Sequence, residues 1–175
     1  MTMGVLGNRH FFLFNCLKQI DENEPIDLST LDKRVEFQKK VYLLQSLGVP
    51  LNYSFGSYIK GPYSRSLAEV GFTIYESPPG SIPNNIDKIT PIDEKSLNKI
   101  NKLKKLIDDL PKNKKKSYWL ELISSLHLLC TKAYPKAKNW EEAENRLKIW
   151  KPLKFTNKDI KIAIKLIEKN DLING

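Results

Sequence analysis

The chain has 175 residues, of which 41% are hydrophobic and 28% are charged, and its formal net charge is +9. This length suits one domain, or one small domain with a helical extension, and the apolar content argues against global disorder. No apolar run approaches the length of a membrane span, and no signal-peptide cleavage site follows the first apolar stretch. We therefore expect a cytoplasmic protein that does not enter a membrane.

The positive charge is concentrated in the second half of the chain. Residues 1–88 hold nine basic and nine acidic side chains, whereas residues 89–175 hold twenty basic and eleven acidic ones. Nine lysines lie within residues 95–116, and the last of them form a candidate phosphate-binding set: Lys112, Lys114, Lys115 and Lys116. Such a cluster favours a polyanionic partner. An AT-rich coding bias is the alternative, because only four of the 29 basic residues are arginine.

The first half is predicted to contain helices separated by one strand. Apolar periodicity predicts helices over residues 9–20 and 32–47, and Gly48 ends the second. Apolar and polar residues then alternate over residues 51–60, which predicts a strand with one packed face. The dipeptide Gly61-Pro62 predicts a turn before a third helix. This order of helix, extended segment and helix is that of a winged-helix unit.

A proline-rich segment, Ser77–Pro83, divides the chain because it cannot continue a helix. We expect a winged-helix-like domain at residues 1–76, a proline-rich linker at 77–91 and a basic helical region at 92–175. Within the basic region, apolar periodicity and capping residues predict four helices, at 93–110, 117–133, 140–150 and 156–170. The predicted fold class is therefore mainly α, with a short strand in the N-terminal half.

Three linked segments of the first half resemble a known family. The pattern Q-K-x-V-Y-L-L occupies residues 38–44, Y-x-F-x-x-Y follows at 53–58, and G-P-Y-S-x-x-L at 61–67. Over residues 8–76 the chain resembles the uncharacterised YwgA-type winged-helix family, which looks distantly akin to phage-associated antitoxin-like proteins. The resemblance implies the fold more than a mechanism, since that family has no settled activity. Its members usually continue into a wing strand, where this chain has Ser77–Pro83 instead.

A second candidate set is basic and aromatic and surrounds the predicted turn: Tyr58, Lys60, Tyr63 and Arg65. Ser64 is predicted to cap the helix that follows, and the free amides of a helix N-terminus favour an anion such as DNA phosphate. Lys60 and Arg65 are therefore candidate nucleic-acid contacts. The alternative is that both tyrosines pack the turn against the Val41–Leu44 helix, which we favour for Tyr63.

No catalytic, cofactor-binding or metal-ligating pattern accompanies these elements. Cys16 and Cys130 form no CxxC pair, which excludes a zinc ribbon, and His127 with Cys130 lacks further ligands for a tetrahedral site. We expect His127 to be packed or hydrogen-bonded. No Gly-rich phosphate loop, HExxH or GxSxG motif is present, so we expect neither an enzyme nor a cofactor.

Two functions remain open at this point. The one we favour is a non-enzymatic, nucleic-acid-associated regulator or antitoxin-like protein that contacts DNA phosphates. The alternative is an adaptor in a defence or toxin-neutralising system, which binds a protein partner or a second copy of itself through the apolar helices 119–133 and 140–150. The scarcity of arginine favours the adaptor, because specific base contacts most often use that residue.

Overall fold

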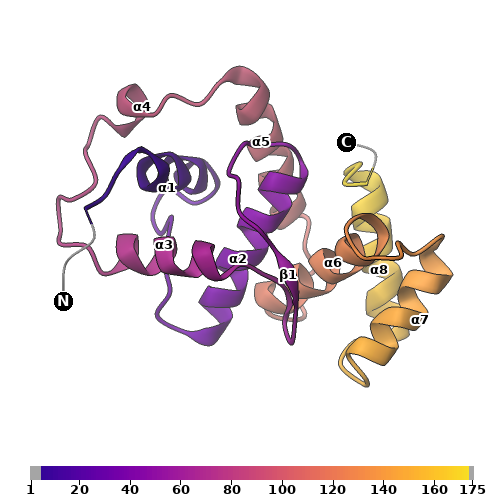
Figure 1. Ribbon diagram of the computed structural model, residues 1–175. Coiled ribbons are helices and arrows are strands. Elements are labelled where there is room, and N and C mark those ends of the chain that lie inside the picture. The colour runs from indigo at the N-terminus through magenta and orange to yellow at the C-terminus, as the bar shows by residue number, and fades with distance from the viewer. Residues whose placement is uncertain (1–4, 174–175) are drawn as a thin grey trace.

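The computed structural model describes residues 5–173, and this part of the chain is mainly helical (Figure 1). Its only sheet, within the described residues, is a two-stranded antiparallel hairpin. The predicted fold class is therefore confirmed. In chain order the elements are α1 (Asn8–Ile20), α2 (Leu31–Ser46), β1 (Gly56–Tyr58), β2 (Gly61–Tyr63), α3 (Arg65–Tyr75), α4 (Ile86–Ile89), α5 (Glu94–Asp108), α6 (Lys116–Thr131), α7 (Trp140–Trp150) and α8 (Asn157–Lys169).

Local signals in the sequence explain where most helices begin. A side-chain oxygen at the N-cap accepts a hydrogen bond from a backbone amide of the first turn, which satisfies a donor that the helix leaves free. Ser64 caps α3 in this way, Asn139 caps α7 and Thr156 caps α8. The end of α2 is equally local, because Gly48 has a φ of 99° that favours glycine.

The predicted strand over residues 51–60 is wrong for most of its length. Only Gly56–Tyr58 is a strand, it pairs with Gly61–Tyr63, and the chain reverses at Ile59 and Lys60. The dipeptide Gly61-Pro62 therefore lies in a strand and not in the turn. Before the hairpin, Gln45 replaces a strand partner: its amide nitrogen donates to the Tyr53 carbonyl and its amide oxygen accepts from the Tyr53 amide, both at 2.7 Å.

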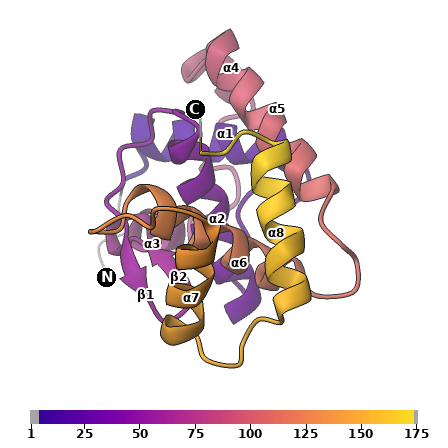
Figure 2. The same ribbon diagram turned by 90° about the vertical axis from the view of Figure 1, so that its right-hand side faces the viewer.

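The core is centred on α2 and α6, which pack on each other (Figures 1 and 2). The hairpin strand β2 also contacts both helices, while α7 and α8 cover the side of α6 that faces the viewer in Figure 2. Trp119 of α6 is completely buried in this core. A single hydrophobic cluster includes residues of every described helix except α4, so residues before and after the proline-rich segment share it.

The predicted linker, residues 77–91, carries a short helix after the proline-rich segment, and this helix packs on the N-terminal elements. Helix α4 contacts α1, and Asn15 donates from Nδ2 to the Thr90 carbonyl over 3.0 Å. Within the described residues no strand follows α3, so the only hairpin lies between α2 and α3. None of the helices described is both long and apolar enough to cross a membrane.

Candidate functional site

Two buried lysines hold the hairpin by its carbonyl groups. Lys39 of α2 donates from Nζ to the carbonyl of Pro62 at 2.6 Å, and Lys151, which follows α7, donates to the carbonyl of Ile59. Burial removes water from the Lys39 ammonium group and lowers its pKa to about 7. The hairpin is thus fixed between α2 and the loop after α7. This position sets the shape of the surface around the hairpin.

A buried carboxylate, Glu121 of α6, lies beside these lysines. Its Oε1 accepts hydrogen bonds from Lys151 at 2.7 Å and from Lys154 at 2.6 Å. Although burial favours the neutral acid, the two ammonium donors outweigh it and lower the pKa of Glu121. Glu121 therefore stays ionised and balances part of a dense positive cluster.

A hollow of about 430 Å³ opens next to this cluster, at the N-terminus of α6. We call it the basic hollow, because four lysines line it against two carboxylates. The N-terminus of α6 adds to the positive potential, since no side-chain acceptor caps it. The lining residues are Asp32, Val35, Lys60, Lys114, Lys115, Ser117, Tyr118, Glu121 and Lys154.

Three of the four lysines already have carboxylate partners, since Lys154 is held by Glu121. Lys114 donates to Asp159 Oδ2 at 2.6 Å, and Lys115 donates to Asp32 Oδ2 at the same distance. The hydrogen bond from Lys115 lowers the pKa of Asp32, so this carboxyl group is ionised at neutral pH. Lys114 also donates to the Tyr118 hydroxyl at 3.1 Å. Each ammonium group has three N–H donors, so Lys114 keeps one donor and Lys115 keeps two for a further acceptor. The hollow can therefore hold an anion without breaking either ion pair.

A second hollow, of about 250 Å³, adjoins the first and shares Val35 and Lys60 with it. We call it the aromatic hollow. Tyr58 and Tyr63 are diagonal neighbours across the hairpin with ring centroids 5.2 Å apart, and Phe72 of α3 joins them in the lining. The complete lining is Leu28, Leu31, Arg34, Val35, Phe37, Gln38, Lys39, Tyr58, Lys60, Tyr63, Ala68 and Phe72.

Three of the six predicted nucleic-acid contacts meet at these hollows, namely Lys60, Lys114 and Lys115. Arg65 lies on the exposed first turn of α3 and pairs with Glu69 at 3.2 Å. Lys116 faces a different hollow, whose lining includes four carboxylates. Lys112 is exposed and lines none of the hollows described in this subsection. Neighbouring lysines in the sequence thus point to different surfaces.

The packing of Tyr63 against the helix that contains Val41–Leu44 stays a prediction. Tyr63 is 37% exposed, lies beside Tyr58 and lines a hollow together with the Arg34–Lys39 part of that helix, α2. The chain reversal comes before Gly61 and not at it. Both tyrosines consequently lie on the solvent side of the hairpin.

Sequence reasoning did not single out Lys39, Lys151 or Lys154, which lie outside the cluster at residues 95–116. Lys154 and Glu121 were missed because they are 33 residues apart and meet only through the packing of α6 against the segment after α7. No local pattern in the sequence signals this meeting.

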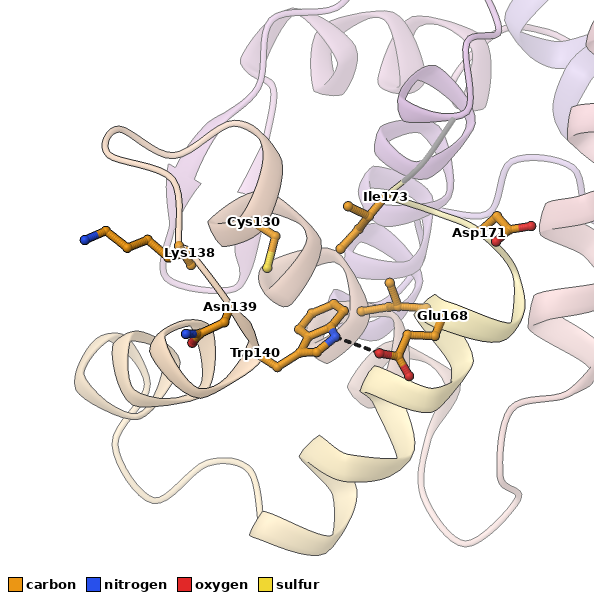
Figure 3. A pocket seen from close by; sticks show the side chains of 9 residues that line it. Cys130, Lys138, Asn139, Trp140, Glu168, Asp171 and Ile173 are labelled. Atoms are coloured by element: carbon orange, nitrogen blue, oxygen red, sulfur yellow. Dashed lines mark hydrogen bonds between the residues drawn. The ribbon is translucent and has the colours of Figure 1, made fainter.

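Another hollow, of about 450 Å³, lies where the end of α6, the start of α7 and the end of α8 converge (Figure 3). The indole of Trp140 donates from Nε1 to Glu168 Oε1 at 2.8 Å, and the sulfur of Cys130 points into the hollow above the ring. Burial raises the pKa of the Cys130 thiol, which disfavours the thiolate. Burial therefore favours the neutral thiol of Cys130 over the thiolate that a nucleophile requires.

The expectation for His127 is confirmed. The side chain is buried, its Nδ1 lies 2.8 Å from the Tyr42 hydroxyl and its Nε2 lies 3.0 Å from the Leu172 carbonyl. Because a carbonyl can only accept, Nε2 carries the proton and Nδ1 accepts from Tyr42. Among residues 5–173 no group of three or more potential metal ligands comes together.

Comparisons of the chain with protein-family models, with curated proteins and with solved structures find no match. The resemblance to the YwgA-type family therefore stays a prediction. Any functional statement has to come from the hollows and their chemistry.

Proposed function

We propose that this protein is a non-enzymatic, nucleic-acid-associated regulator or antitoxin-like protein of the winged-helix type. In this proposal the basic hollow contacts the phosphates of the nucleic acid. The observation that carries it is the meeting of four lysines around one hollow, at an uncapped helix N-terminus. Lysine ammonium groups and free helix amides are the groups that bind phosphate oxygens in proteins.

Lys60 is the central contact in this proposal. It belongs to the lining of both hollows, and no carboxylate lies within ion-pair distance of its ammonium group in the described structure. Lys114 and Lys115 are held in place by Asp159 and Asp32, so their ion pairs position them at the rim. Binding would release counterions from the nucleic acid, which makes the affinity depend steeply on salt.

The test is fluorescence anisotropy of labelled DNA at about 50 mM and about 200 mM salt. We expect binding at the lower salt that weakens strongly at the higher one. The Lys60→Gln variant should weaken binding and reduce the salt slope by about one contact. The matched control is Lys104→Gln, which removes an exposed lysine on α5, away from both hollows. Absence of binding at the lower salt, or equal effects of both variants, would reject the proposal.

A second candidate function is the protein-binding adaptor. The observation that favours it is a set of exposed aliphatic side chains at the hairpin tip, in the last turn of α7 and just after α7: Ile59 (75% exposed), Ile149 (81%) and Leu153 (104%). Leu153 also has a φ of 60°, which is unusual for a leucine. An adaptor would bind a partner encoded beside it, such as a toxin, and Leu153→Ser would abolish that binding. Nucleic-acid binding by the wild type would be absent.

A further inference from the structure

The two adjoining hollows differ in chemistry, and together they limit the kind of ligand that can fill both. One is lined by aromatic and aliphatic side chains and the other by lysines, and Lys60 lies in both linings. A ligand that fills both must carry a flat apolar group next to an anionic one. A nucleotide has this composition, since a base is joined through its sugar to a phosphate.

Two aromatic rings of the aromatic hollow are partly exposed to solvent. The side chain of Tyr58 is 57% exposed and that of Tyr63 is 37% exposed, although both are aromatic and lie beside an apolar lining. Arg34 lies over the Phe72 ring at 5.4 Å, which adds a cationic plane at the same hollow. Bases stack on such faces with about 1–3 kcal/mol per base, and the contact tolerates every base because each has a π-face.

Three polar side chains of the aromatic hollow already bind the protein's own backbone. Gln38 donates to the carbonyl of Ser64 and accepts from its amide, both at 2.9 Å, and Lys39 donates to Pro62. Arg34 donates from Nε to the Leu28 carbonyl at 2.9 Å. The amide of Gln38, the one side-chain amide in this lining, is therefore not free to read a base edge. Stacking without sequence readout is the recognition that this lining supports.

We infer that the two hollows together bind one unpaired nucleotide of a single-stranded nucleic acid, with the base in the aromatic hollow and its phosphate in the basic hollow. A duplex cannot supply this ligand, because its bases are paired and stacked inside the helix. The inference rests on the proposed function, since it names the form of nucleic acid that the basic hollow contacts. It goes further in making the hairpin tyrosines part of the interface.

The experiment compares a labelled single-stranded oligonucleotide, a duplex of the same sequence and an abasic strand of the same length, all by fluorescence anisotropy. We expect the single strand to bind at least fivefold tighter than the other two, the lower bound of one stacked base. Tyr63→Ala should weaken single-strand binding by at least fivefold. Tyr63→Phe should stay within twofold, because it keeps the ring. The control Tyr134→Ala removes an exposed tyrosine outside both hollows and should have no effect.

The outcomes separate this inference from the function on which it rests. Duplex binding as tight as single-strand binding, with no effect of Tyr63→Ala, would overturn the inference and leave phosphate contact standing. Free mononucleotide binding as tight as that of the oligonucleotide would overturn the assignment to a strand. Binding of no nucleic acid would overturn both. Because Tyr63 is exposed, its substitution leaves the core intact, which far-UV circular dichroism of each variant checks.

Discussion

Removal of the buried carboxylate at Glu121 should destabilise the protein far more than loss of an ordinary ion pair. Glu121 is 3% exposed and accepts from Lys151 and Lys154, while the side chain of Lys151 is only 2% exposed. In Glu121→Gln the Lys151 ammonium group keeps its charge in the interior but loses its counter-charge. Breaking a buried pair on one side costs about 3–5 kcal/mol, and we expect a loss of this size.

The assay is urea denaturation followed by tryptophan fluorescence and circular dichroism, which gives the free energy of unfolding. The matched control is Glu144→Gln, because Glu144 and Lys148 also meet at 2.6 Å but on a solvent-exposed face of α7. An exposed pair of this i,i+4 kind contributes about 0.3–0.5 kcal/mol. The two variants therefore differ in burial and not in the distance between the charges.

A double variant tests the cause of the loss. Glu121→Gln with Lys151→Met removes both charges of the buried pair, which costs less than leaving one of them without its partner. The Ile59 carbonyl also loses its Lys151 donor, so we expect the double variant to recover part of the stability that Glu121→Gln loses. A loss below about 1 kcal/mol in Glu121→Gln, similar to that of Glu144→Gln, would refute the reasoning that the charge of Lys151 is uncompensated.

Two further changes test the packing around the site. Burial lowers the pKa of His127 from 6.5 to about 4, so between these pH values the unfolded chain takes up a proton that the folded protein does not, and stability falls by about 3 kcal/mol on acidification. Denaturation at pH 7 and at pH 4 measures this loss, which should be smaller in His127→Gln. Gly61→Ala should cost at least about 1–3 kcal/mol, because Gly61 has a φ of 88° and an added Cβ would lie 2.8 Å from Ser125 Oγ.

A different result would contradict each of these two predictions. If the free energy of unfolding falls by the same amount between pH 7 and pH 4 in the wild type and in His127→Gln, His127 does not cause the loss. For the hairpin, Gly56→Ala is the matched control, since a Cβ there meets nothing within 4 Å and its φ is not positive. Equal stability of the two alanine variants would show that the close approach of Gly61 to α6 does not constrain the hairpin.

All described helices except the short α4 could be predicted from the chain alone because the causes of helix formation are local. A side-chain cap such as Ser64 or Asn139 acts within one turn, and an apolar stripe recurs every three or four residues. The alternation at residues 51–55 was also informative, since Leu51 and Tyr53 are buried while Asn52 and Ser54 are exposed. Alternation does not show which segment pairs with the backbone of this stretch. Here the side chain of Gln45 in α2 bonds the backbone of Tyr53 in place of a neighbouring strand.

The candidate site depended on contacts between distant segments. The lysine cluster at residues 95–116 read as one surface, yet packing directs Lys115 to Asp32 and Lys116 to another hollow. Lys154 reaches Glu121 only because the chain folds back after α7. Local patterns determine which elements form, because their energies come from neighbours in the chain. Which charges gather around a hollow is decided by how those elements pack, because that depends on contacts over tens of residues.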